Sequence, residues 1–133
     1  MVLFALLALV GCFAPLKAKA QAVKGVHIGS QHFPNRSYNN FNPGMYWRTA
    51  DGWQAGYYVN SVERTSVYGA RVYDVLEGRM QIAVGLVTGY PAGPVLPLVV
   101  PSMLLGRSGF RLSFVPAPKH HAPALHLSWE LRQ

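Results

Sequence analysis

The sequence has one cysteine, Cys12, and few charged residues. Only 13% of its 133 residues are charged, about half the share of roughly 25% that is usual in soluble domains. The single cysteine excludes an intrachain disulfide framework and a cysteine-based zinc cluster. The low charge excludes a disordered chain or a coiled coil, and the length allows one domain. A compact domain with a partly apolar surface and a protein embedded in lipid both remain open.

The chain also lacks an apolar run long enough for a membrane-spanning helix. Val2–Pro15 is apolar but shorter than the roughly 20 residues that such a helix needs. Ala18-Lys19-Ala20 follows and has the small-x-small pattern of a signal peptidase site before Gln21. This predicts a signal peptide over residues 1–20 and an exported domain over residues 21–133.

Two other interpretations of the first residues stay open. Leu9-Val10-Gly11-Cys12 resembles a bacterial lipoprotein box with Cys12 as the lipidated residue. The apolar run could also be retained as a membrane anchor.

After residue 21, helical spacing of apolar residues is missing and alternation with a period of two is common. Gly and Pro interrupt every helical candidate, whereas alternating runs bounded by turn residues are typical of strands. The alternation predicts eight strands, near residues 23–32, 44–49, 53–60, 65–75, 80–88, 95–105, 109–115 and 124–131.

These strands have one large apolar face and one small or polar face. Leu125, Leu127, Trp129 and Leu131 alternate with His126, Ser128 and Glu130, for example. A membrane barrel would turn the apolar face to lipid, whereas a soluble sandwich or lipocalin-like barrel would turn it inward. Alternation alone does not tell which way a face points.

Three features favour the membrane barrel. The chain carries an export signal, its expected strands are even in number with alternating short and long links, and most of its 16 aromatic residues lie near strand ends. Such barrels have an even strand number and aromatic girdles at both interfaces. We therefore expect an all-β fold, an eight-stranded antiparallel transmembrane β-barrel.

Two polar groups at expected strand ends suggest a site. His32 ends the first strand, and Asn60-Ser61 ends the third, at the same rim if short and long links alternate. A His within hydrogen-bond reach of a Ser is the minimum for general-base or nucleophilic acyl chemistry. Rim residues of these types also commonly only cap loops and bind water.

The order of these parts resembles the PagP-like outer-membrane lipid A palmitoyltransferase family. In that family a strand ending in a catalytic His precedes a stretch similar to Arg36-Ser37-Tyr38-Asn39-Asn40-Phe41-Asn42-Pro43-Gly44. An adjacent Asp-Ser pair follows its third strand, where this chain has Asn60-Ser61, and a later segment looks like Pro94-Val95-Leu96-Pro97-Leu98.

The resemblance implies a barrel in the outer membrane of a Gram-negative bacterium that moves an acyl chain from a phospholipid to lipid A of lipopolysaccharide. His32 and Ser61 would be catalytic, with Asn60 beside them in place of the family's acidic residue. Neither a cofactor nor a metal is expected, the protein would act as a monomer, and nucleic acid is excluded as a partner. Pro94, Pro97 and Pro101 would remove ladder donors and open a lateral gap for lipid.

Two other functions stay open because Asn60 replaces the acidic residue. One is a non-enzymatic small barrel with a structural or lipid-binding role. The other is a lipid A deacylase-like hydrolase, to which His126-x-Ser128 with Glu130 bears a loose likeness.

Three further expectations concern single residues. His27 lies five positions before His32, so the two face opposite ways on a regular strand. His120-His121 with His126 could hint at a metal, although Cys and carboxylates are missing at ligand spacing. Guanidinium groups could bind lipopolysaccharide phosphates or could be ordinary girdle charges in water; the candidates are Arg64, Arg71, Arg107 and Arg111.

Overall fold

The computed structural model describes residues 22–33, 39–76, 80–116 and 123–132. Within these ranges the protein is all-β, and no helix is long and apolar enough to cross a membrane. The expectations for the signal peptide, Cys12 and the His120-His121 pair lie outside the described residues.

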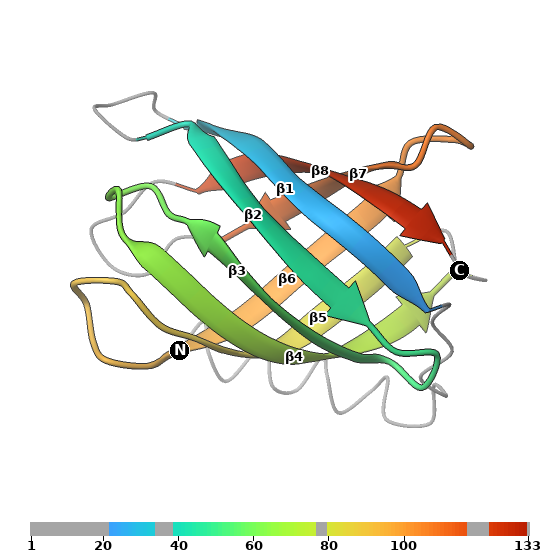
Figure 1. Ribbon diagram of the computed structural model, residues 1–133, viewed down its shortest axis with the longest axis horizontal. Helices are drawn as coiled ribbons and strands as arrows, with labels where there is room; N and C mark the ends of the chain where they lie inside the picture. Colours follow the sequence, from blue (N-terminus) through green and yellow to red (C-terminus); the bar gives the residue numbers. More distant parts are fainter. Residues whose placement is uncertain (1–21, 34–38, 77–79, 117–122, 133) are drawn as a thin grey trace.

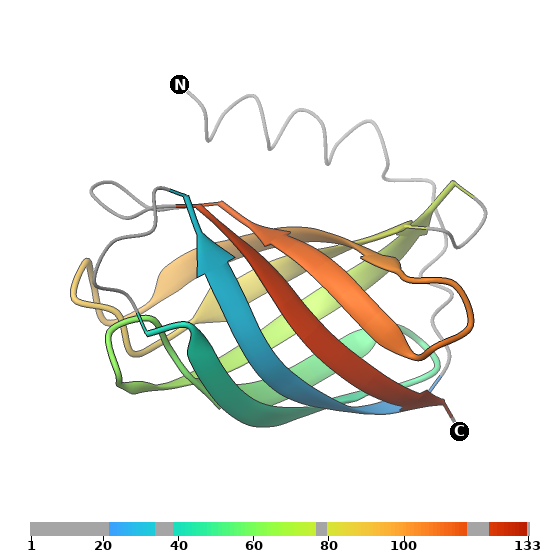
Figure 2. The same ribbon diagram turned by 90° about the horizontal axis from the view of Figure 1, so that it is seen from above.

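Eight strands form one closed antiparallel barrel in which each strand pairs with the next and β8 pairs with β1 (Figures 1 and 2). The expectation of eight antiparallel strands is confirmed. The strands are β1 (Val23–His32), β2 (Phe41–Arg48), β3 (Trp53–Val59), β4 (Thr65–Val75), β5 (Met80–Val87), β6 (Leu96–Leu104), β7 (Phe110–Val115) and β8 (Ala124–Arg132).

The start of β2 differs most from the sequence expectation. This strand begins at Phe41 and not at residue 44, so Pro43 lies inside it. The β1–β2 register runs through His27↔Gly44 and then shifts to Gly29↔Phe41. Proline has no N–H to donate and is tolerated where a bulge interrupts the ladder. The bulge therefore lets the strand continue past the proline that was expected to end it.

The barrel has two rims, which we name the His32 rim and the Arg48 rim. β1 ends at His32, and β3, β5 and β7 end at the same rim, on the left in Figure 1. β2 runs the other way and ends at Arg48, where a tight turn leads to Trp53 at the start of β3. His32 and the end of β3 thus lie at one rim, as expected from alternating links.

On β8 the apolar face of the strand points outward and the polar face points into the barrel. Leu131 is 53% exposed, whereas its neighbour Glu130 is 3% exposed. The same alternation holds on β7, where Phe110 and Phe114 are exposed while Arg111 is buried. On these two strands the large apolar side chains therefore lie on the outside of the barrel.

The ladder between β6 and β7 is short. Among the described residues it joins only Ser102–Leu104 to Arg111–Ser113, although β6 pairs with β5 along its whole length from Leu96. β6 also contains Pro97 and Pro101, which donate no ladder hydrogen bond. Among the described residues, the first half of β6 thus has no ladder partner on β7.

Tyr46 is packed inside the barrel and is 2% exposed. Its ring lies against Gly25 on the neighbouring strand, and a Cβ built at Gly25 would stand 2.1 Å from Tyr46 Cζ. A Cβ at Gly69 would meet nothing within 4 Å. Only the first of these glycines is required by packing.

Gly25→Ala is expected to destabilise the barrel by about 1–3 kcal/mol, because overpacking displaces the Tyr46 ring. Gly69→Ala serves as the matched control and should be neutral or slightly stabilising, since Ala is favoured over Gly in a strand interior. Chemical denaturation gives the free energy of unfolding of each variant. Equal stabilities of the two variants would contradict the packing of Tyr46 on Gly25.

Candidate functional site

The lumen of the barrel holds a cavity of about 520 Å³, within the range of roughly 300–1,000 Å³ of small-molecule sites. One part of its wall is aliphatic and comes from β4, β5 and β6. The remaining wall, mainly from β1, β2, β7 and β8, carries the His, Tyr, Arg, Glu and Ser side chains. The aliphatic members include Val72, Ala83, Val87, Leu96, Leu98 and Val100.

His32 lies at the rim of this cavity and is 5% exposed. Its Nδ1 is 2.7 Å from Asn40 Oδ1. Because an amide oxygen only accepts, Nδ1 carries a hydrogen and donates it to Asn40. The proton-accepting atom of a neutral His32 is then Nε2.

Ser61 lines the same cavity. It is bonded to Asn39, the residue before Asn40 in the loop between β1 and β2. The Asn39 N–H donates to the Ser61 carbonyl oxygen at 2.9 Å. The dipeptide Asn39-Asn40 thus holds both expected catalytic residues, one through a side chain and one through the backbone.

Asn60 is fully buried, and its side chain closes the β3–β4 turn. Its Oδ1 accepts the N–H groups of Val62 and Arg64, both at 3.0 Å. Its Nδ2 donates to Ser66 Oγ and to the Gly89 carbonyl at 3.0 and 2.9 Å. The oxygen of the Asn60 amide is therefore engaged in the turn, and its nitrogen is engaged by β4 and by the segment after β5. The side chain that contacts the His32 ring is instead Asn40. The sequence did not distinguish Asn40 from its neighbours as a site residue.

Two tyrosines stand beside this rim. Tyr58 and Tyr90 share a hydrogen bond of 2.6 Å between their hydroxyls, and both line the cavity. Burial raises the pKa of the Tyr90 phenol above its ordinary value, while the bond from Tyr58 acts in the opposite direction. Tyr90 therefore stays protonated at neutral pH and contributes a neutral hydroxyl.

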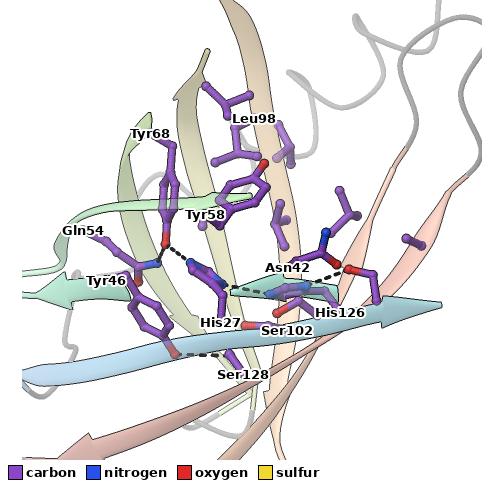
Figure 3. Close-up of a pocket in the computed structure, with 18 of the residues that line it drawn as sticks. His27, Asn42, Tyr46, Gln54, Tyr58, Tyr68, Leu98, Ser102, His126 and Ser128 are labelled. Atoms are coloured by element: carbon purple, nitrogen blue, oxygen red, sulfur yellow. Dashed lines mark hydrogen bonds between the residues drawn. The ribbon is translucent and has the colours of Figure 1, made fainter. Parts of the chain in front are cut away.

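Deeper in the lumen, His27 lies between Tyr68 and His126 (Figure 3). Its Nε2 is 3.0 Å from the Tyr68 hydroxyl, and its Nδ1 is 2.8 Å from His126 Nε2. His126 Nδ1 is in turn 2.8 Å from Ser30 Oγ. At the other end of this series of hydrogen bonds, Gln54 Nε2 donates to the Tyr68 hydroxyl at 3.0 Å.

The shared facing of His27 and His32 corrects the expectation for a regular strand, whereas a lumen position was one of the two expected for His27. His27 and His32 both line the lumen, although their odd spacing predicts opposite faces. The register of β1 shifts between His27 and Gly29. A bulge adds one residue to the strand and reverses the alternation beyond it.

A buried ionic cluster lies toward the Arg48 rim. The Glu130 side chain is wholly buried and receives Arg48 Nη2 at 3.2 Å and Arg111 Nε at 2.7 Å. The Tyr46 hydroxyl donates to the same carboxylate at 2.8 Å. Arg48 Nη1 also donates to the side-chain oxygens of Gln54 and Gln81. Arg111 is thus an internal cation, and the expectation that it could bind lipopolysaccharide phosphate is wrong.

The His126–Ser128 pair also behaves differently from a hydrolase dyad. Both residues are buried in the lumen. Ser128 Oγ lies 3.3 Å from the Tyr46 hydroxyl, whereas the serine bonded to His126 is Ser30. In the part of the chain that the structure describes, no group of three or more His, Cys, Asp or Glu residues could hold a metal ion.

Glu130→Ala is expected to destabilise the protein by about 3–5 kcal/mol, because it leaves two buried guanidinium groups without their carboxylate. Glu63→Gln removes one negative charge at an exposed turn position and should change stability by less than about 0.5 kcal/mol. Denaturant titration of both variants measures the difference. Similar values would show that the cluster contributes little.

A comparison with models of known protein families finds no match, and a comparison with curated proteins also finds none. The basis for a function is therefore the geometry of the lumen and its rim.

Proposed function

We propose that this protein is an outer-membrane barrel that transfers an acyl chain from a phospholipid to lipid A, with His32 and Ser61 at the reacting rim. The observation that carries the proposal is the lumen cavity, which combines an aliphatic wall with a His and a Ser at one end. Acyl chains are apolar, and the ester that is exchanged is polar. A cavity with these two regions fits both.

Placement in a membrane is supported by the outer surface. Trp47, Trp53 and Trp129 are exposed toward the Arg48 rim. Exposed phenylalanines, Phe41 and Phe114 among them, lie toward the His32 rim. Aromatic belts at both ends of an apolar band are typical of barrels that cross a bilayer.

The proposed reaction exchanges one ester for another. His32 Nε2 accepts the proton of the lipid A hydroxyl as this hydroxyl attacks the acyl ester of the phospholipid. The ester bond breaks, and the lysophospholipid leaves with the proton. The acyl group ends as an ester on a hydroxyl of lipid A. Asn40 holds the Nδ1 side of His32, and Nε2 is the proposed base. The short β6–β7 ladder offers lipid a lateral path to this rim.

A non-enzymatic lipid-binding barrel is the second candidate. It is favoured by Asn60, whose amide oxygen and nitrogen are both engaged by neighbouring groups and which gives His32 no carboxylate. The cavity would hold an acyl chain in this case too, without exchange of the ester.

Insertion into a bilayer is testable through the three tryptophans. Phospholipids brominated on their acyl chains should quench the fluorescence of the refolded protein in vesicles, because Trp47, Trp53 and Trp129 point outward. The urea-unfolded chain mixed with the same vesicles is the control and should not be quenched. Emission that brominated lipid leaves unchanged in the folded protein would contradict membrane insertion.

Acyl transfer is testable by mass spectrometry of lipid A from cells that express the protein. The wild type should add one acyl chain, and His32→Ala should lower this activity by about 10²–10⁴-fold, the usual contribution of a general base. Ser61→Ala and Asn40→Ala should also lower it.

Ser108→Ala is the matched control, because Ser108 is exposed in the β6–β7 turn at the opposite rim. This variant should keep full activity. Unchanged lipid A would favour the lipid-binding barrel, and loss of an acyl chain would favour a deacylase.

A further inference from the structure

Gln54, Tyr68, His27, His126 and Ser30 form one continuous hydrogen-bonded chain across the lumen. Figure 3 labels the first four of these residues. The four hydrogen bonds that join these five residues are between 2.8 and 3.0 Å long. Tyr68 and both His rings can each donate on one side and accept on the other. The direction in which the hydrogens point is therefore decided at an end of the chain.

Arg48 decides the direction at the Gln54 end. Its Nη1 is 3.3 Å from the side-chain oxygen of Gln54, and a guanidinium group donates but never accepts. The oxygen of the Gln54 amide must face Arg48, so its NH₂ group faces Tyr68. Tyr68 Oη consequently accepts a hydrogen from Gln54.

The remaining hydrogens follow from this first one. The Tyr68 O–H has His27 Nε2 as its acceptor, because the reverse arrangement would leave the phenolic hydrogen without one among the described partners. His27 Nε2 then accepts, so Nδ1–H donates to His126 Nε2. His126 Nδ1–H in turn donates to Ser30 Oγ. Both rings carry their hydrogen on Nδ1.

Ser30 is the last member of this chain and lines the cavity. Its oxygen accepts from His126, which leaves its own hydrogen to point elsewhere, and the structure gives its hydroxyl no second side-chain partner within the described ranges. We propose that Ser30 donates this hydrogen to the carbonyl or carboxylate oxygen of an acyl group held in the lumen. The identity of this ligand rests on the proposed function, whereas the direction of the hydrogen-bond chain does not.

The position and polarity of Ser30 fit this role. Ser30 lies two residues before His32 on the lumen side of β1, about 7 Å along the strand. Donors aligned in one direction polarise one another, so a hydroxyl that accepts from such a chain is a stronger donor. A carbonyl oxygen gains charge when its ester is attacked, and a donor aimed at it stabilises that charge.

The direction of the chain is testable by nitrogen NMR of the histidine rings in the refolded protein. The wild type should show the hydrogen on Nδ1 in both His27 and His126. Gln54→Glu replaces the NH₂ donor by an acceptor, so the Tyr68 hydroxyl should turn to Glu and the whole chain should reverse. Both rings should then carry the hydrogen on Nε2.

Gln81→Glu is the matched control. Gln81 also accepts from Arg48 Nη1, at 3.1 Å, but its amide nitrogen donates to Asp74 and not to the chain. The substitution places a carboxyl group beside Arg48 without changing a member of the hydrogen-bonded chain, so it should leave both rings unchanged. Hydrogens on Nε2 in the wild type, or the same spectrum in wild type and Gln54→Glu, would overturn the proposal.

The role of Ser30 is testable with palmitate labelled with carbon-13 at the carboxyl group. Ser30→Ala should weaken binding about five- to tenfold, which corresponds to one hydrogen bond, and should remove the shift of the carboxyl signal. Gln54→Glu should have a similar effect although Ser30 is present, because His126 then accepts the Ser30 hydrogen. Gln81→Glu should bind as the wild type does.

Two outcomes separate this proposal from the proposed function. Unchanged affinity and carboxyl shift in Ser30→Ala would overturn the role of Ser30. A wild type that leaves lipid A unchanged, yet has Nδ1–H rings and Ser30-dependent palmitate binding, would support the role of Ser30 and count against acyl transfer.

Discussion

The wholly buried carboxylate of Glu130 is the group on which the rest of the lumen depends. It accepts hydrogen bonds from Arg48, Arg111 and Tyr46, and a charge enclosed in this way has no water to replace a lost partner. Arg48, fixed by Glu130, fixes the amide of Gln54, and Gln54 sets the direction of the chain that ends at Ser30. An electrostatic constraint at one rim therefore determines the donor and acceptor pattern near the other.

This network requires a barrel whose polar faces point inward. The same alternation that brings Arg48, Arg111 and Glu130 into the lumen places leucine, phenylalanine and tryptophan side chains on the outer surface. The internal charges and the apolar exterior are thus two consequences of one strand pattern. They differ in how specific they are: the exterior suits any apolar surroundings, whereas the interior combines an aliphatic wall with a small number of directed polar groups.

The sequence was sufficient to predict the strands because alternation with a period of two is a local property. It also placed His32 and Ser61 at one rim, since their distance along the chain follows from strand and link lengths. It failed at His27, because the bulge before Gly29 arises from pairing with β2 and β8 and has no clear local signal. It did not find Asn40, because two neighbouring asparagines in a polar loop do not show which one reaches His32.

The amino-acid sequence by itself determined the number of strands, their alternation and the rim at which the His and the Ser lie, because these depend on residue spacing. Only the tertiary structure decided that the apolar faces point outward, that Arg111 is an internal cation and that His126 is bonded to Ser30 and not to Ser128. Those outcomes depend on closure of the barrel. Closure brings β1 beside β8, and no property of either segment alone specifies which side chains then meet across the lumen.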